Sequence, residues 1–335
     1  MSAARPLRAE PEPLLSVEDL RTCFETEAGT SQVLAGVNLR LGRGEVLGLV
    51  GESGSGKTMT ALSILGLVPE PGRIVSGEVR FDGQDLRRLD REALRQVRGR
   101  GIAMVFQEPQ STLNPVRTCG DQIGELLREH LRMGRAASRA QTLELLRSVH
   151  LPDPERVARQ YPHELSGGMC RRVAVALALS CQPQLLIADE ATSGLDRTIQ
   201  AQILALLAEL QAAHDLAVLH ITHDLAVVAE TAARVAVMYA GRIVETGPTS
   251  KVFAAPAHPY TRALLRARPG LLLAPRRLEP IPGVAPDPRN LPSHCPFQAR
   301  CPFRVERCLQ QDPEPRWLGP EHWSRCFVDL PGAVG

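Results

Sequence analysis

A glycine-rich segment, Gly51-Glu-Ser-Gly-Ser-Gly-Lys57-Thr58, has the composition and spacing of a phosphate-binding loop. Its glycines allow backbone N–H groups to converge on phosphate oxygens, and the helical pattern from residue 59 points its positive end at the same place. The Lys57 ammonium is predicted to bind the β- and γ-phosphates, and the Thr58 hydroxyl to ligate Mg²⁺. The predicted nucleotide-binding residues are Gly51, Glu52, Ser53, Gly54, Ser55, Gly56, Lys57, Thr58 and Met59.

Two adjacent carboxylates, Asp189 and Glu190, follow the apolar segment 185–188. Open α/β sheets bind their ligands at the carboxyl ends of the strands, where these side chains would lie. Asp189 is predicted to hold the Mg²⁺ shell, and Glu190 to orient and polarise a water against the γ-phosphate. Such a pair alone is often only a solvated strand end. After a phosphate-binding loop in the same chain, it predicts hydrolysis of a nucleoside triphosphate.

The segments that must position these residues alternate between strand and helix patterns. Short apolar runs at 45–50, 185–188 and 217–221 predict buried strands, and residues 198–213 predict a helix. Strands that alternate with helices favour a parallel sheet with crossover helices, which is an α/β fold. Residues 121–149 break the alternation, because apolar residues recur there at helical spacing. We interpret this stretch as an inserted helical subdomain.

The composition is that of a globular protein with a core of ordinary size. Of the 335 residues, 44% are hydrophobic and 23% are charged, and 39 basic against 37 acidic side chains leave a net charge of +2. This balance and the aromatic content of only 4% give no reason to expect a nucleic-acid partner. No apolar run is long enough to span a membrane and no signal-peptide core is visible, so a cytosolic chain is expected.

Further motifs resemble those of the ABC-type ATPases. The segment Leu165-Ser166-Gly167-Gly168-Met169, which precedes a helical pattern, resembles the LSGGQ signature of that family. Gln107 is similar to the glutamine of the Q-loop, and the segment Ser193-Gly-Leu-Asp196 to the D-loop. His223 is similar to the switch histidine, and Phe24 lies where family members stack an aromatic ring on adenine.

This resemblance implies a P-loop ATPase of ABC type, with a RecA-like mixed sheet core and a helical subdomain. It implies that Glu190, His223 and Gln107 are catalytic, and that Mg²⁺ is held by Thr58, Gln107 and Asp189. In the family, the signature of one subunit contacts the γ-phosphate of the ATP held by the other. The complete site is therefore expected only in a dimer, which ATP binding closes and hydrolysis releases.

The chain departs from the family pattern at two positions beside these motifs. Arg171 follows the signature where the family often has Gln, and Ala191 follows Glu190 where the family often has Pro. Neither change removes a predicted phosphate or metal ligand. We therefore expect effects on fine tuning and not the loss of ATPase activity.

The chain after residue 251 resembles the C-terminal extension of ATPases from oligopeptide and dipeptide importers. Frequent prolines at 256–320 predict loops and short elements with little core of their own. The resemblance rests on His258-Pro-Tyr-Thr261, Ile281-Pro-Gly283 and the cysteines that follow. The predicted domains are a flexible tail 1–13, an ATPase domain 14–250 with the helical subdomain inserted at about 108–165, and the extension 251–335.

The resemblance implies the ATP-hydrolysing subunit of an importer, bound at the cytoplasmic face of the cell membrane. The implied partners are a second ATPase subunit, favoured to be a paralogue, two membrane permeases and an external solute-binding protein. Peptides are the expected cargo, with nickel or opines as alternatives within the same subfamily. Other classes of ABC ATPase fit less well. Chromosome-type ATPases separate the phosphate-binding loop from the signature by long coiled coils, and ribosome-type members usually carry two ATPase units in one chain. Exporter ATPases are commonly fused to a membrane domain.

Four cysteines, Cys295, Cys301, Cys308 and Cys326, gather near the end of the chain with the spacing C-x₅-C-x₆-C-x₁₇-C. This is not the paired spacing of a zinc ribbon or a bacterial ferredoxin. From the residues alone, Zn²⁺, a [4Fe–4S] cluster and free thiols all remain open, whereas the resemblance points to the iron–sulfur cluster. A metal ion or cluster bound by these cysteines would stabilise the extension, which has little hydrophobic core of its own. Because the predicted ATP site lies within residues 24–223, we expect cysteine changes to alter nucleotide affinity little.

Overall fold

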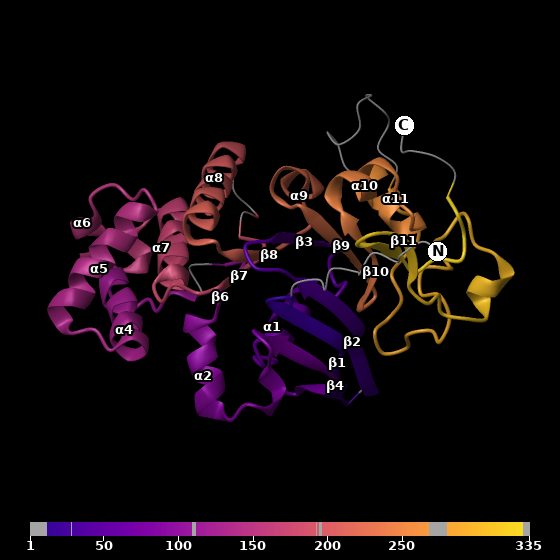
Figure 1. Ribbon diagram of the computed structural model, residues 1–335, viewed down its shortest axis with the longest axis horizontal. Coiled ribbons are helices and arrows are strands. Elements are labelled where there is room, and N and C mark those ends of the chain that lie inside the picture. Colours follow the sequence, from indigo (N-terminus) through magenta and orange to yellow (C-terminus); the bar gives the residue numbers. More distant parts are fainter. Residues whose placement is uncertain are drawn as a thin grey trace, which may run out of the picture.

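A largely parallel sheet forms the centre of the molecule (Figure 1). In the order β9-β3-β8-β7-β6, neighbouring strands pair in parallel. The predicted strands at 45–50, 185–188 and 217–221 are confirmed as β3, β7 and β8. The bounds are β3 (Val46–Val50), β6 (Ile102–Val105), β7 (Leu185–Asp189), β8 (Ala217–Thr222) and β9 (Arg234–Tyr239). Because β3 and β7 pair with the same strand, β8, the segments that follow them leave the sheet at one edge.

The sheet continues beyond β9 with antiparallel strands, two of which come from the C-terminal extension. The order is β9-β10-β12-β11, with β10 (Arg242–Pro248), β11 (Arg316–Gly319) and β12 (His322–Ser324). Glu245 of β10 is completely buried at this junction. Its carboxylate accepts hydrogen bonds from the backbone N–H groups of Ala257 (2.8 Å) and His258 (2.9 Å) and contacts His322 Nε2 at 3.1 Å. The extension is therefore joined to the central sheet, although the sequence predicted only loops and short elements.

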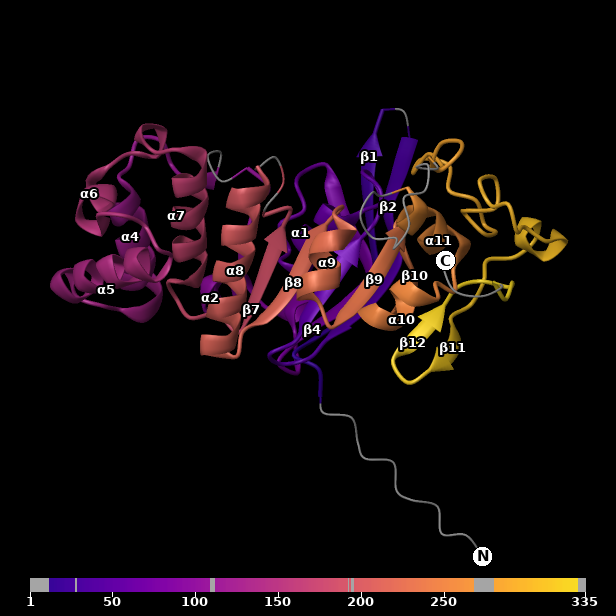
Figure 2. The same cartoon turned by 90° about the horizontal axis from the view of Figure 1, so that it is seen from above.

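A second, antiparallel sheet packs on the central one and has the order β2-β1-β4-β5. Its strands are β1 (Leu15–Thr26), β2 (Gly29–Leu41), β4 (Gly72–Phe81) and β5 (Gln84–Asp85), and α1 (Lys57–Ile64) packs between the two sheets (Figure 2). Buried side chains of both sheets and of α1 form one core, for example Leu20, Leu34, Leu49, Ile64 and Leu219. This core supports the start of α1, which carries Lys57 and Thr58.

The remaining helices cover the central sheet and form one end of the molecule. They are α2 (Arg91–Arg100), α4 (Cys119–Leu131), α5 (Arg135–Ser148), α6 (Pro154–Arg159), α7 (Gly167–Leu179), α8 (Arg197–His214), α9 (Leu225–Thr231), α10 (Thr249–Ala254) and α11 (Pro259–Arg266), with short 3₁₀ helices η1 (Leu86–Arg88), η2 (Pro162–Glu164) and η3 (Glu306–Leu309). The helix predicted at 198–213 is confirmed as α8. In Figures 1 and 2, α4, α5 and α6 gather at the end opposite the extension.

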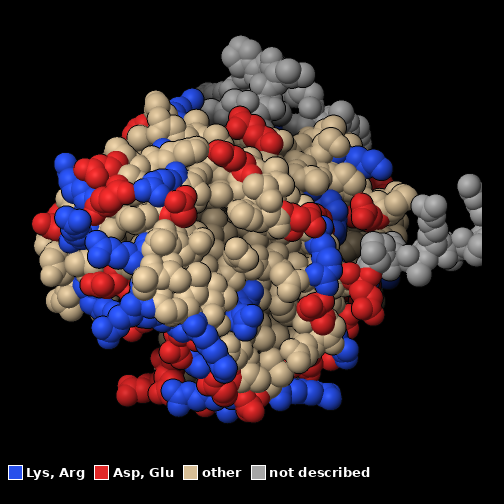
Figure 3. All heavy atoms as spheres, turned by 60° about the vertical axis from the view of Figure 1, so that its left-hand side comes forward, with Lys and Arg blue, Asp and Glu red and all other residues tan. Residues whose placement is uncertain are grey.

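The end of the molecule formed by α4, α5 and α6 has buried apolar side chains between its helices and both basic and acidic side chains on its surface. Ile123, Leu127 and Leu146 are fully buried where α4 and α5 meet. A groove lined by α4, α5 and α6 carries several charged side chains, among them Arg128, Arg135, Arg139, Arg159, Asp121 and Glu155. Figure 3, in which this end of the molecule comes forward, shows basic and acidic side chains intermixed around an area of uncharged atoms.

The structure describes residues 12–27, 29–108, 112–191, 193, 196–267 and 280–330. Most of the predicted tail 1–13, and Gly194 and Leu195 of the predicted D-loop, lie outside the described residues. Among the helices that the structure describes, none is long and apolar enough to cross a membrane. The domain boundaries predicted from the sequence stay a prediction.

Candidate active site

The phosphate-binding loop connects β3 to α1, as its motif requires. Gly56 has φ 107° and precedes α1, and a Cβ there would lie 2.8 Å from Met238 Cε and 2.9 Å from Leu34 Cδ2. Only glycine combines this left-handed backbone with so close an approach. The loop therefore ends in a helix N-terminus whose first N–H groups have no partner within the helix, which is a suitable site for an anion.

Lys57 lies beneath the loop and is almost fully buried. Its Nζ donates hydrogen bonds to the backbone carbonyls of Gly51 and Glu52, each at 2.9 Å. The ammonium is thereby held against the segment 51–56 that would surround the phosphates. The arrangement places a buried positive charge beside the free N-terminus of α1, so both attract the same anion.

Asp189 ends β7 and has the features of a cation ligand. Its side chain is 2% exposed, and its Oδ1 has no hydrogen-bond partner among the described residues. Burial raises the pKa of this carboxyl, and a hydrogen bond from the Thr58 hydroxyl partly offsets the effect. A buried carboxylate oxygen without a partner, next to a threonine hydroxyl, fits a hard cation such as Mg²⁺. The two predicted ligands Asp189 and Thr58 are thus in contact.

Glu190 is the centre of a polar cluster that contains the other predicted catalytic residues. Its carboxylate accepts hydrogen bonds from Gln107 Nε2 (3.0 Å) and Ser193 Oγ (2.9 Å), and it lies 3.1 Å from His223 Nδ1. Burial acts to raise the pKa of Glu190, but the hydrogen bonds from His223 and Ser193 outweigh it and lower the pKa. Glu190 is therefore ionised at neutral pH. Gln107 contacts Glu190 here, and its predicted role as a Mg²⁺ ligand stays a prediction.

The predicted signature residues lie at the start of α7. Ser166 is the N-cap of this helix, and its Oγ accepts a hydrogen bond from the backbone N–H of Met169 at 3.3 Å. Leu165 is buried, whereas Ser166 and Gly167 are exposed and Gly168 is half-buried. The signature therefore presents a helix N-terminus and a serine hydroxyl at the molecular surface.

Two further predicted site residues have structural contacts of their own. Phe24 is half-buried on β1, and its ring lies so close to Gly72 of β4 that a Cβ on Gly72 would approach Cζ to 2.6 Å. Asp196 is the N-cap of α8 and accepts hydrogen bonds from the N–H groups of Thr198 and Ile199, both at 3.0 Å. The adenine-stacking role of Phe24 and the D-loop role of Asp196 stay predictions.

Arg171 proves to be part of the site's framework, which the motifs alone did not indicate. It is nearly buried in α7, and it donates hydrogen bonds to the backbone carbonyls of Gln107 (3.2 Å) and Ser193 (3.1 Å). Gln107 and Ser193 are the two residues that donate to Glu190 Oε2. Arg171 therefore holds the signature helix and the partners of Glu190 in one unit. The only sequence signal was its departure from the family pattern.

We predict that Arg171→Met lowers ATP turnover by about tenfold in the assembled protein, because each hydrogen bond from a charged donor contributes about 1.5–3 kcal/mol. The KM for ATP should change little, since the phosphate loop is untouched. The neighbouring Arg172 is a matched control, because it donates to Val149 and Gln202, away from Glu190. Steady-state ATPase assays in which Arg171→Met and Arg172→Met behave alike would contradict this role.

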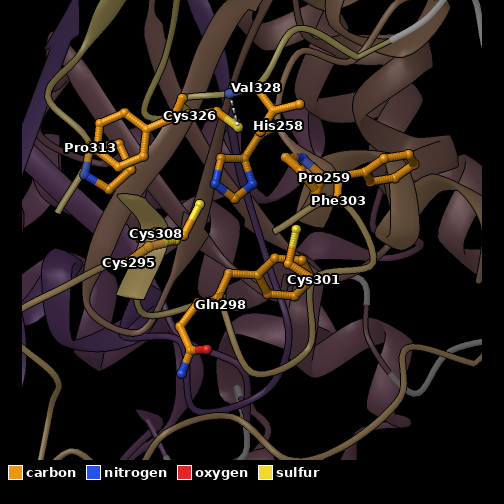
Figure 4. Close-up of a pocket in the computed structure, with 12 residues that line it drawn as sticks. His258, Pro259, Cys295, Gln298, Cys301, Phe303, Cys308, Pro313, Cys326 and Val328 are labelled. Atoms are coloured by element: carbon orange, nitrogen blue, oxygen red, sulfur yellow. Dashed lines mark hydrogen bonds between the residues drawn. The ribbon is translucent and has the colours of Figure 1, made fainter. Parts of the chain in front are cut away.

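The four late cysteines lie around one small pocket in the extension (Figure 4). Figure 4 shows the thiol groups of Cys301, Cys308 and Cys326 around the side chain of His258, and Cys295 lines the same pocket. Burial and the neighbouring thiols raise the pKa of Cys295 to about 12 and that of Cys326 to about 11. All four are free cysteines. Within the described part of the chain, no three His, Cys, Asp or Glu side chains are arranged to hold a metal ion.

Together, the loop before α1, the buried Asp189 and the Glu190 cluster define an ATPase of the ATP-binding cassette class. Family models match residues 34–193, described as ABC transporter, and residues 244–308, described as oligopeptide/dipeptide transporter, C-terminal region. The chain belongs to the ABC transporter family, as an ATP-binding protein whose C-terminal region is of the oligopeptide/dipeptide type.

Relatives of nearly equal length support this membership. The dipeptide transport ATP-binding protein DppD of Escherichia coli is 44% identical over 320 residues, which cover 96% of this chain and 98% of the relative. DppD of Bacillus subtilis is 46% identical over 318 residues, 95% of each chain. A dimeric ATP-binding cassette in a post-hydrolysis state with ADP and Pi has a TM-score of 0.63 and 28% identity, and the match covers 70% of this chain and 98% of that chain.

Proposed function

We propose that this ATPase is the energy-supplying subunit of an importer for di- or oligopeptides. The observation that carries the proposal is the C-terminal region 244–308, which matches the oligopeptide/dipeptide type and follows the residues 34–193 that match the ABC transporter model. The relatives that are named for dipeptide transport match this chain over almost their whole length. Nickel and opines are the competing cargoes.

In this proposal, each polar group of the site has one task in ATP hydrolysis. The loop 51–59 and Lys57 bind the triphosphate, and Asp189 and Thr58 hold Mg²⁺, which neutralises phosphate charge. The Glu190 carboxylate accepts a hydrogen bond from the attacking water and aims it at the γ-phosphorus. Gln107 and His223 hold Glu190 in place, and His223 also supplies a donor for charge that develops on the γ-phosphate. The contacts of Glu190 with both residues support this division of roles.

The nucleotide site is proposed to be completed by the signature of a second ATPase subunit, favoured to be a paralogue. The exposed Ser166 and Gly167 at the N-terminus of α7 would contact the γ-phosphate of the nucleotide held by that subunit. The likeness to a dimeric cassette supports this arrangement. In return, the ATP on this chain's loop would be closed by the partner's signature, so ATP drives the dimer together.

The other proposed partners are two permeases and an external solute-binding protein, at the cytoplasmic face of the cell membrane. We propose that the helical subdomain at about 108–165 contacts the permeases, because it follows Gln107 directly and carries the charged groove of α4, α5 and α6. Gln107 would then connect the permease contact to Glu190. Cross-links that map the permease contact to residues 235–250 instead would contradict this placement.

The transport proposal is tested by deleting the gene and measuring uptake of a radiolabelled dipeptide. We expect uptake to fall to background and to return with the wild-type gene but not with Glu190→Gln. Unlabelled di- and tripeptides should compete, whereas Ni²⁺ and an opine should not. Competition by Ni²⁺ or the opine, or dipeptide uptake that is unchanged in the deletion strain, would contradict peptides as the cargo.

We also propose that the four cysteines of the extension bind a [4Fe–4S] cluster, which stabilises the packing of the extension on the ATPase domain. What supports this is the convergence of four thiols on one pocket in a segment with few helices and strands. A single zinc would need sulfurs only about 3.8 Å apart, given Zn–S bonds of about 2.3 Å. A [4Fe–4S] cluster binds each thiolate to a different iron, so its four sulfurs would lie farther apart than the sulfurs around a single zinc. When bound, the cluster would supply folding free energy.

Purified without oxygen, the full-length protein should be brown, with broad absorbance near ~400 nm and about four irons per chain. Cys301→Ser should lose the colour and make residues 290–330 sensitive to proteases, because ligand binding stabilises this segment. Cys181→Ser, a buried cysteine outside the pocket, should keep the iron. Colourless protein with one zinc per chain, or metal-free protein with four titratable thiols, would reject the cluster.

A further inference from the structure

Glu52, the second residue of the phosphate loop, is held by the distant C-terminal extension. Arg300 Nη1 donates to Glu52 Oε2 at 2.7 Å, and Arg300 Nη2 donates to Glu52 Oε1 at 2.9 Å. The guanidinium and carboxylate thus form a paired, two-bond contact, with the Arg300 side chain only 4% exposed. Such charge-assisted, bidentate contacts are strong and fix orientation as well as position.

The backbone of Glu52 is held from two other directions. Its N–H donates to the hydroxyl of Tyr260, on α11, at 2.8 Å. Its carbonyl accepts the hydrogen bond from Lys57 Nζ at 2.9 Å. A shift of Glu52 would therefore also shift a hydrogen-bond partner of Lys57, the residue that is proposed to bind the phosphates.

Arg300 belongs to the segment 295–301, here called the cysteine loop because Cys295 and Cys301 are its ends, and contacts inside and outside this loop hold its side chain. Its Nε donates to the carbonyl of Pro282 at 2.8 Å, and its guanidinium carbon lies 5.8 Å from the ring centre of Tyr239 and 5.9 Å from that of Phe297. Backbone hydrogen bonds from Arg300 to Phe297 and from Cys301 to Gln298 form consecutive turns in the loop. The same short loop thus carries two pocket cysteines and the arginine that pairs with the phosphate loop.

The charge of Glu52 explains why this pairing matters for ATP. A carboxylate in a loop that binds a triphosphate repels it unless a cation neutralises the charge. Arg300 supplies that cation from within the protein. Without Arg300, Glu52 would keep its charge beside the phosphates or take up the ammonium of Lys57 instead.

We propose that Arg300 is a positioning residue for the ATPase, which neutralises and orients Glu52 in the phosphate loop and so links ATP affinity to the cysteine loop. The proposal rests on the proposed role of loop 51–59 in binding the triphosphate. It differs from the sequence-based expectation that changes at the cysteines alter nucleotide affinity little.

The test is a set of ATP-binding and ATPase measurements on full-length variants. We expect Arg300→Met to raise the Kd and KM for ATP about tenfold while kcat changes less, as for the loss of a charge-assisted hydrogen-bonded pair of which one partner, Glu52, is partly exposed. Glu52→Gln should raise the Kd and KM for ATP less than Arg300→Met does. It breaks the ion pair with Arg300, but it also removes the negative charge that would repel the phosphates. The double variant Arg300→Met/Glu52→Gln should bind ATP better than Arg300→Met alone. Such a rescue cannot arise from a chain that has merely unfolded.

A matched control is Arg242→Met, since the ion pair of Arg242 with Asp312 also joins β10 to the extension but does not touch the phosphate loop. Equal losses of ATP affinity in Arg300→Met and Arg242→Met, or additive losses in the double variant, would overturn the proposal. If Lys57→Ala leaves ATP binding intact, the role of the loop itself fails. If Lys57→Ala abolishes binding and Arg300→Met has no effect, only the role of Arg300 fails.

The link to the cysteine loop is tested with Cys301→Ser, by measuring iron content and the Kd for ATP on the same anaerobic samples. In the otherwise wild-type chain, we expect Cys301→Ser to lose the iron and to raise the Kd for ATP several-fold. Added to the double variant Arg300→Met/Glu52→Gln, Cys301→Ser should raise the Kd for ATP no further. Loss of iron with an unchanged Kd would overturn the link, as would an equal rise of the Kd in both backgrounds.

Discussion

Glu190→Gln is expected to reduce ATP turnover by about 10²–10⁴-fold, the usual contribution of a general base, while ATP binding is retained. The substitution keeps a side chain of the same shape. The remaining oxygen can accept from Gln107 and Ser193, and the new amide can donate to His223 Nδ1 in its other tautomer. The geometry is thus preserved and only the negative charge that orients the water is lost, so we expect ATP to hold the dimer closed.

The measurement is steady-state hydrolysis in the assembled transporter, combined with size-exclusion chromatography in ATP to detect the closed dimer. Glu209→Gln is a suitable control, because Glu209 is exposed on α8 and its ion-pair partner is His150. Because the pKa of Glu190 is lowered, wild-type turnover should fall only when the pH drops below the ordinary carboxyl range. Near-normal hydrolysis by Glu190→Gln would remove this residue from the chemistry.

Lys57→Ala is expected to weaken nucleotide binding by about a hundredfold, since two charge-assisted hydrogen bonds to phosphate contribute about 3 kcal/mol together. The substitution also removes the hydrogen bonds to the carbonyls of Gly51 and Glu52, which loosens the loop. Unlike Glu190→Gln, this variant should therefore fail at binding and show no trapped dimer.

Titration of the full-length protein with a fluorescent ATP analogue and Mg²⁺ gives the affinity directly. Lys251, the other lysine of the chain, is exposed on α10 and provides a chemically identical control. We expect Lys251→Ala to bind as the wild type does. An unchanged Kd in Lys57→Ala would mean that the phosphates bind elsewhere.

The part of the fold that the sequence predicted consists of elements with strong local signals. β3, β7 and β8 are short apolar runs, buried on both faces between helices, and each appears as such in the sequence. The helix α8 has apolar residues at helical spacing, and it is preceded by Asp196, a good N-cap residue. Asp189 ends β7, Glu190 follows it, and Lys57 lies at the end of the loop that follows β3, so their meeting at one sheet edge could be inferred from topology.

Contacts between distant segments could not be predicted in this way. The antiparallel sheet of β1, β2 and β4 depends on pairings such as Leu15 with Phe81, which no local pattern specifies. The pairing of Arg300 with Glu52 joins residues that are 248 positions apart. Both residues are common surface types, so each looks solvated when the sequence is read alone. Only the fold reveals that the extension returns to the phosphate loop.

ATP-driven uptake of a labelled dipeptide into proteoliposomes that contain the complete transporter tests the central claim most directly. With the wild-type chain, we expect uptake that requires ATP, Mg²⁺ and the solute-binding protein. With Glu190→Gln in this chain, we expect ATP to bind and uptake to remain at background. Wild-type uptake by the Glu190→Gln transporter, or ATP hydrolysis by the wild type without any peptide uptake, would contradict the claim.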